Sequence, residues 1–178
     1  MNQQQFDTYL LSITGKDRVG VVSAVTGYLF ETGANLADCS YAVLGEGFEF
    51  SCVAEFSAGS QTEEIESGLN SINLLEGARI TVSSFPFELL RGQGGEITHV
   101  VEVTGGDQPG LVSRLSDVLV DYNANIVRMS SRRVSIEGGF DYRTRIATNI
   151  PADRFIALEA ALYNTAGSLG LDCKVEKT

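Results

Sequence analysis

The chain has 178 residues, and its content of 43% hydrophobic and 20% charged residues is typical of a globular protein rather than a disordered one. Lys and Arg number 13 against 23 Asp and Glu, so the formal net charge is −10, which argues against general nucleic-acid binding because phosphate neutralisation needs clustered cations. No apolar run approaches the ~18 residues of a transmembrane helix, and the N-terminus has no signal-peptide pattern. We therefore expect no membrane contact and a cytoplasmic protein.

The first half of the chain is predicted to fold in the order β-α-β-β-α-β. Apolar residues at Val21, Val25 and Leu29 have helical spacing. Later, Phe48 and Phe50 alternate with polar residues, as in a strand with one buried face. The expected strands are 8–14, 36–44, 48–56 and 78–83, and the expected helices are 19–32 and 62–75.

The second half repeats this pattern at an offset of 90 residues, which places Gly15 over Gly105 and Gly20 over Gly110. The expected strands are 98–104, 125–136, 140–149 and 172–176, and the expected helices are 109–122 and 152–169. We predict an α+β protein of two ferredoxin-like domains, each an antiparallel four-stranded sheet with two helices on one face. The predicted division is a first domain at 1–84, a linker at 85–97 and a second domain at 98–178.

The single histidine and the three cysteines form no metal-ligand or Cys-x-x-Cys pattern, so we expect no metal, no cofactor and no disulfide framework. Cys39, Cys52 and Cys173 are each expected to be a small buried residue in a strand. His99 has no evident nucleophile beside it and is expected to be a hydrogen-bonded strand residue.

The loop from the first strand to the first helix is the best-kept part of the repeat. Free backbone N–H groups at a helix start attract a carboxylate, glycines allow close approach, and an asparagine amide offers both donors and acceptors. This combination suits a small zwitterion such as an α-amino acid. The candidate ligand-binding residues are Gly15, Asp17, Arg18, Val19, Gly20 and Asn35, and in the second copy Gly105, Asp107, Gln108, Pro109, Gly110 and Asn125.

A purely structural interpretation of the same loop also stands. Asp17 and Asp107 can cap a helix, Pro109 is common in a first helical turn, and the two asparagines can hold left-handed turns.

The segments 14–22 and 104–112, with Asn35 and Asn125, resemble ACT domains, which are amino-acid-sensing modules. Two of them without a catalytic domain resemble the glycine cleavage system transcriptional repressor family, most closely over residues 34–50. The resemblance implies side-by-side pairing of ACT units, a homodimer of the chain, and amino-acid binding between the paired units. It also implies a partner, the activator protein of the glycine cleavage operon, and makes glycine or serine the first ligand to test. Val19 departs from the proline usual in that family.

Arginines gather on the middle hairpin of the second copy, whereas the chain up to Leu90 has a net charge of −9. We expect Arg143 and Arg145 to share one strand face. The opposite face, with Tyr142, Thr144 and Ile146, is assigned to the core. The arginine face is either simply solvated or a docking surface for an acidic protein or for the acidic copy of another chain. The candidate partner-binding residues are Arg128, Arg132, Arg133, Arg143 and Arg145.

The function expected from these observations is a non-enzymatic amino-acid sensor that acts through a protein partner. A protein–protein adaptor with degenerate pockets is one alternative. An acylphosphatase-like hydrolase is another, since Arg18 and Asn35 are the residue types that such an enzyme uses in this fold. RNA binding would need exposed aromatic residues on the central strands, and here the phenylalanines are expected in the core.

Overall fold

The computed structural model describes residues 6–106 and 108–178 of the chain. The chain divides into two compact units, residues 1–89 and 90–178, and each is described by itself. The division falls inside the segment predicted as a linker. No helix among the described residues has both the length and the apolar character needed to cross a membrane.

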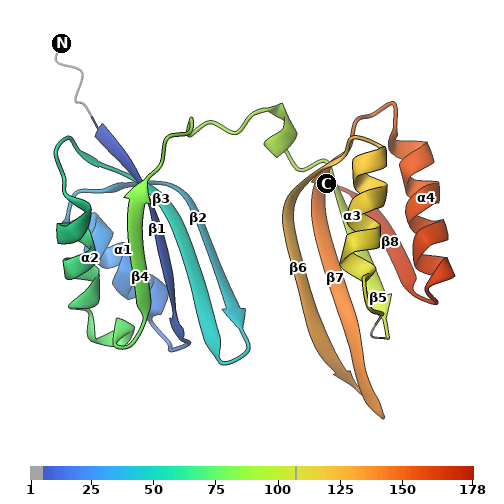
Figure 1. Cartoon of the computed structure of the whole chain (residues 1–178), viewed down its shortest axis with the longest axis horizontal. Coiled ribbons are helices and arrows are strands. Elements are labelled where there is room, and N and C mark those ends of the chain that lie inside the picture. The colour runs from blue at the N-terminus through green and yellow to red at the C-terminus, as the bar shows by residue number, and fades with distance from the viewer. Residues whose placement is uncertain (1–5, 107) are drawn as a thin grey trace. The chain divides into compact units, whose positions relative to one another are not determined.

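The first unit follows the predicted β-α-β-β-α-β order (Figure 1). Its elements are β1 (Phe6–Lys16), α1 (Val21–Glu31), β2 (Asn35–Leu44), β3 (Gly47–Ser57), α2 (Thr62–Asn70), the 3-10 turn η1 (Asn73–Leu75) and β4 (Arg79–Ser84). The strands form one antiparallel sheet in the order β2-β3-β1-β4, and both helices cover the same face of it. The other face, which no helix covers, is called the open face below.

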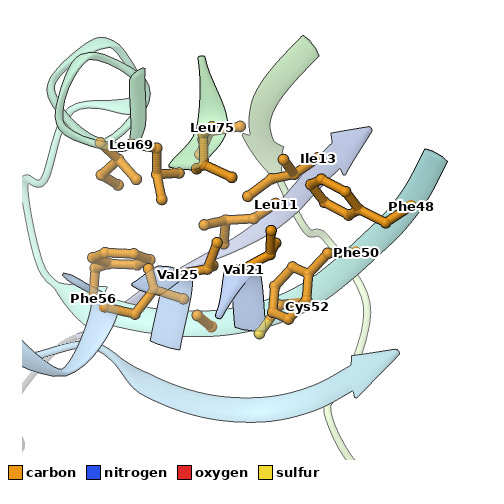
Figure 2. Packing of buried hydrophobic residues seen from close by; sticks show 14 residues of the cluster. Leu11, Ile13, Val21, Val25, Phe48, Phe50, Cys52, Phe56, Leu69 and Leu75 are labelled. Atoms are coloured by element: carbon orange, nitrogen blue, oxygen red, sulfur yellow. The ribbon is translucent and has the colours of Figure 1, made fainter. Parts of the chain in front are cut away.

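The core of the first unit lies between this sheet and its helices. Figure 2 shows Leu11 of β1, Phe50 of β3 and Val25 of α1 meeting in one apolar layer. All three side chains are at most 2% exposed. The strict alternation along β3 makes this possible, because every second side chain points to the helices.

The second unit repeats the arrangement. Its elements are η2 (Gln93–Gly95), β5 (His99–Gly105), α3 (Leu111–Asp121), β6 (Asn125–Ile136), β7 (Gly139–Asn149), α4 (Phe155–Ser168) and β8 (Asp172–Lys177). The sheet order is β6-β7-β5-β8 and the pairs are antiparallel. Val101, Leu115, Ile146 and Leu162 are completely buried in a separate core. Two ferredoxin-like α+β units in tandem are therefore confirmed.

Helix boundaries differ from the predictions for local reasons. The segment 62–75 is not one helix, because α2 ends at Asn70 and Ile72 is extended, with φ −76° and ψ 114°, before the 3-10 turn. The first helices begin two residues later than predicted, since Gly20 and Gly110 adopt left-handed conformations that cannot continue a helix backwards.

The edge strands β2 and β6 each carry one extra residue near their start. Leu36 pairs with Ala54 and Asp38 pairs with Val53, so Ala37 forms a bulge. The second unit has the same irregularity at Val127, between Ile126 and Arg128. The bulge is thus part of the repeated fold.

One expectation for the cysteines was wrong. Cys39 is exposed, whereas Cys52 is buried and Cys173 is half-buried. Every residue of β2 is exposed, because this strand extends beyond the part of the sheet that the helices cover. Cys39 faces the helix side opposite Cys52 but lacks a layer above it.

Candidate functional site

The repeated loop ends each time in a glycine that begins a helix. Gly20 has φ 97° and Gly110 has φ 80°, both in the left-handed region that favours glycine. Neither helix start is capped by a side chain. The first N–H of each helix donates to a loop carbonyl, Val21 to Arg18 and Leu111 to Gln108, and no side chain caps the N–H groups that follow.

Asp17 does not cap α1. Its Oδ1 accepts a hydrogen bond of 2.5 Å from the hydroxyl of Tyr41, which lies on β2. This bond raises the pKa of Tyr41, with smaller contributions from burial and from the carboxylate charge. Asp107, the corresponding residue of the second copy, lies outside the described residues.

Gly15 and Gly105 are needed for packing rather than for ligand approach. A Cβ atom on Gly15 would lie 2.9 Å from the Cβ of Ala78. A Cβ atom on Gly105 would lie 2.5 Å from Cδ2 of Leu171. In both units this glycine lets the end of the first strand lie against the segment that leads into the last strand.

A pocket of about 290 Å³ lies between the loop of the first unit and the helix side of β2. We call it the first pocket. It is lined by Asp17, Arg18, Val19, Gly20, Val21, Val22, Ser23, Tyr41 and Val43. Four of the six candidate ligand residues of the first copy thus line one pocket.

A pocket of about 230 Å³, the second pocket, occupies the same place in the second unit. It is lined by Gln108, Pro109, Gly110, Leu111, Val112, Ser113, Ser131, Tyr142 and Thr144. Each of its six loop and helix residues corresponds to a residue of the first pocket at the offset of 90, and the counterpart of Asp17 lies outside the described residues. The repeat therefore builds two equivalent pockets.

The strand residues of the two pockets differ, and Tyr41 and Val43 of the first correspond at the offset of 90 to Ser131 and Arg133 of the second. The Tyr41 ring stacks on Phe48, with centroids 5.7 Å apart, and its hydroxyl reaches Asp17. Ser131 is too short to span its pocket, so the second pocket extends to Tyr142 and Thr144 of β7. The hydroxyls of Ser131 and Thr144 lie 2.8 Å apart in its floor.

Asn35 and Asn125 line neither pocket. Each is the first residue of its strand, whereas the pockets lie toward the other end of that strand. Asn35 donates a 2.9 Å hydrogen bond to Glu55 on the open face. Asn125 donates to the carbonyl of Gly94 at 2.7 Å and so holds η2 against β6. The structure does not bring these residues together with the loops inside a unit.

The five arginines of the second hairpin divide between its two faces. Arg143 and Arg145 alternate with the buried Thr144 and Ile146 and lie on the open face, as predicted. Arg132, which pairs with Arg143, and Arg128, which pairs with Ala147, lie on that face too. Arg133 lies on the helix side, where its Nε donates to the Tyr142 hydroxyl at 2.7 Å and its guanidinium lies over the ring. Arg133 therefore belongs to the surroundings of the second pocket.

Sequence reasoning missed Tyr41, Ser131, Tyr142 and Thr144. The available signal was the alternation of β2, β3, β6 and β7, which assigns each of these residues to the helix side. Translating that alternation into a pocket wall requires the cross-strand register, which the bulges at Ala37 and Val127 shift by one residue.

His99, Cys52 and Cys173 line neither pocket, and burial shifts the pKa of each. His99 is 7% exposed and stacks on Phe155 at 4.5 Å, and burial lowers its pKa. Burial raises the pKa of the Cys52 thiol, and it raises that of Cys173 to about 11. Among the described residues, no group of three or more His, Cys, Asp or Glu side chains could hold a metal ion.

Comparison with protein families matches both units. Residues 7–77 match a family model described as an ACT domain, and residues 99–159 match another model of the same description. A UPF0237 protein of Streptococcus pneumoniae serotype 4 (strain ATCC BAA-334 / TIGR4) is 30% identical over 80 residues, covering 38% of this chain and 91% of that protein.

Two solved structures resemble the whole chain. An unknown protein from Galdieria sulphuraria is 23% identical with a TM-score of 0.75, covering 98% of this chain and 99% of that one. A protein proposed to be a glycine cleavage system transcriptional repressor is 14% identical with a TM-score of 0.69, covering 97% and 98%. At these identities both likenesses show the fold alone.

The family matches fall one in each unit and include both pockets' loops. ACT domains are ligand-sensing regulatory modules, so the matches support a ligand-sensing regulatory role. The chain belongs to the ACT-domain proteins and carries two ACT domains in tandem.

Proposed function

We propose that this protein is a non-enzymatic sensor that binds a small α-amino acid, glycine or serine first, in the second pocket. The observation that carries the proposal is the recurrence of one pocket at equivalent places in two units, with Tyr41 in the first where the second has the shorter Ser131. Packing alone would not require both units to keep a hollow at the same helix start.

The second pocket offers complementary groups to such a ligand. The start of α3 has no acidic residue in its first turn and would attract the ligand carboxylate. The hydroxyls of Ser131 and Thr144, with that of Tyr142, can accept hydrogen bonds from the ammonium group. A volume of about 230 Å³ has room for a molecule of this size.

The first pocket is the weaker candidate because its polar groups are joined by a charge-assisted hydrogen bond, whereas Ser131 and Thr144 of the second pocket share a bond between two neutral hydroxyls. The hydroxyl of Tyr41 is bonded to the carboxylate of Asp17, so a ligand would have to replace that hydrogen bond. We therefore expect one ligand per chain at low concentration, held by the second unit.

Asn35 and Asn125 would bind the ligand only where a second ACT unit pairs with this one. An antiparallel β2 strand from such a unit would bring its first residues beside the last residues of this β2, next to the first pocket. The exposed apolar side chains on β2 and α1, including Val43 and the 82% exposed Phe30, support such side-by-side pairing.

For signalling, we propose a repressor-like role in which ligand binding alters contact with a protein partner, an activator protein of the glycine cleavage operon. The whole-chain likeness to a protein proposed to be a glycine cleavage system transcriptional repressor supports this choice. The acidic composition supports an indirect effect on transcription over direct nucleic-acid binding. An adaptor with empty pockets is the alternative.

A hydrolase is less well supported by the geometry. An acylphosphatase-like reaction would need Arg18 and Asn35 around one phosphate, whereas Arg18 lines the first pocket and Asn35 lies at the far end of β2, bonded to Glu55.

The test is a pair of reciprocal substitutions followed by calorimetric titration with glycine and serine. Ser131→Tyr would fill the second pocket and should weaken binding at least tenfold, about 1.4 kcal/mol. Tyr41→Ser would open the first pocket and should add a second binding site per chain. Ser135→Tyr, on the same strand outside the pocket lining, is the matched control and should bind as the unmodified chain does.

Two results would contradict the proposal. No heat from either amino acid, or from the other eighteen standard ones, would favour the adaptor. Binding that Ser131→Tyr leaves unchanged, while the variant keeps its fold by circular dichroism, would move the ligand away from the second pocket.

A further inference from the structure

We propose that the open face of the second sheet docks on the open face of the first sheet of a second copy of this chain, so that two chains form a two-fold dimer with two identical sheet-to-sheet contacts. This interface uses neither pocket and neither β2 edge, and it goes beyond the sensing function proposed above.

The open face of the second sheet is divided by charge. Its β6 and β7 half carries four arginines, with Asp141 near the hairpin tip. Its β5 and β8 half carries Glu102, Asp172 and Glu176, with Lys174 between them. The four arginines are Arg128, Arg132, Arg143 and Arg145, and we call them the basic face.

Within this sheet, the arginines of the basic face have few carboxylates to neutralise their charge. Arg143 Nε lies 3.7 Å from Glu102 Oε1, which is an ion pair without a hydrogen bond. Arg128, Arg132 and Arg145 are exposed on strands. Four like charges on two neighbouring strands repel one another, and an anionic surface would relieve that repulsion.

The open face of the first sheet has the opposite division. Its β2 and β3 half carries Asp38, Glu49 and Glu55, which we call the acidic face. Its β1 and β4 half carries Lys16 and Arg79. The repeat accentuates this contrast, because Asp38 of the first copy corresponds to Arg128 of the second.

Stacking the two faces with their hairpin halves together matches charge in both halves at once. The acidic face then meets the basic face, and Lys16 and Arg79 meet the acidic β5 and β8 half. The strips between carry uncharged residues, Leu10 and Val53 on one sheet and Val100 and Ala147 on the other. Such residues allow the close approach of two aligned sheets.

The area favours a second copy as the occupant. Strands lie about 4.8 Å apart and rise about 3.4 Å per residue, so a four-stranded face six residues long offers about 400 Å². One contact would then bury about 800 Å² in total, the size of a weak encounter. A two-fold dimer forms the contact twice and reaches about 1,600 Å², the size of a stable interface.

The experiment reverses each face in a separate full-length chain. The first variant carries Arg143→Glu and Arg145→Glu, and the second carries Asp38→Arg and Glu49→Arg. Alone, each variant would present two faces of like charge, so self-association should weaken at least tenfold. In an equimolar mixture both contacts of the mixed dimer are again complementary. Sedimentation equilibrium at low salt measures the mass of each variant, of the mixture and of the unmodified chain.

We expect both variants to lose one association step relative to the unmodified chain, and the mixture to recover it. In 1 M salt, where the screening length is about 3 Å, the recovered association should weaken again. An unmodified chain that sediments as a monomer overturns the proposal. A mass that neither reversal changes also overturns the proposal. So does a mixture whose mass remains as small as that of each variant alone, because any contact between the two faces would then lie within one chain.

Arg114→Glu with Arg154→Glu is the matched control, because it changes the net charge equally on the helix side of the same unit. It should leave the mass unchanged. Glycine and serine titrations of the two reversal variants separate this proposal from the sensing function, since neither variant changes a residue that lines a pocket.

Discussion

Tyr9 and His99 occupy the same position in the two repeats. The Tyr9 ring packs against Phe56, and the His99 ring packs against Phe155. The Tyr9 hydroxyl donates to the carbonyl of Ser60 at 2.7 Å. His99 stacks on Phe155, and its Nδ1 lies 2.9 Å from the hydroxyl of Thr98. The difference matters for pH, because only the histidine changes charge between pH 5 and 8.

We expect the free energy of unfolding of the second unit to fall as the pH is lowered through about 6.5. Burial lowers the pKa of His99, the nearby Lys177 lowers it further, and Glu159 acts in the opposite direction. The unfolded chain therefore takes up the proton first, at its ordinary pKa, and stability is lost until the folded protein is protonated too. His99→Phe keeps a ring against Phe155 and should lose less stability between pH 7.5 and 5.5. Urea unfolding at the two pH values measures the difference.

Tyr9→Phe provides the control at the equivalent position, since it removes a hydrogen bond but no group that titrates in this range. If the unmodified chain and His99→Phe lost equal free energy between the two pH values, the buried histidine would not be the cause.

At the same scale, the sequence singled out the loop residues of the pockets but not their walls. Gly20 and Gly110 were singled out because they recur at the offset of 90, whereas their left-handed conformation, which delays the helix start, was not predicted. Tyr41 and Ser131 were missed because their neighbours come from another strand. Which side chains a strand residue meets depends on register, and register is a property of the pair.

Among the elements, β2 has the most unusual environment. It is an edge strand of ten residues, wholly exposed, with apolar side chains on its helix side. Long exposed edges of this kind are templates for pairing with another strand. The sequence predicted the strand and nearly its extent, but it also predicted a buried Cys39, which is exposed because the helices do not reach β2.

Val43→Lys should weaken side-by-side association of ACT units at least tenfold, because it places a charge on the apolar stripe of β2, where Val43 is 53% exposed. The fold should be unaffected, since no core residue changes. Sedimentation velocity over a concentration series measures the association. Ser67→Lys on the exposed side of α2 adds the same charge elsewhere and serves as the control. Equal association of both variants and the unmodified chain would exclude β2 from the interface.

At the scale of the whole molecule, each unit has its own four-stranded sheet and its own hydrophobic core. The duplication was predictable from the sequence because glycines and turn residues recur at a constant offset. The reversed charge of the two open faces was only partly predictable. The hairpin arginines were found, but their division between two faces, with Arg133 apart from the rest, followed only from the pairing of β6 with β7.

A fragment of residues 90–178 should fold by itself, since all members of its core cluster lie within it. Its circular dichroism should show a cooperative thermal transition, as expected for a small single domain. Leu115→Ala within the fragment should lower its free energy of unfolding by about 2–5 kcal/mol, the cost of a buried cavity. A fragment without a cooperative transition would mean that the core of this unit is insufficient.

The bulge at Ala37 determines where β2 tolerates a change of length. Removing Ala37 leaves Leu36 and Asp38 opposite their present partners, Ala54 and Val53, so every other side chain keeps its face. Removing Ser40 instead would shift the register between Ser40 and the bulge, so Asp38 and Cys39 would each point to the opposite face of the sheet. Ala37 is therefore the position in β2 at which a deletion leaves every remaining side chain on its present face of the sheet. The matching position in β6 is Val127.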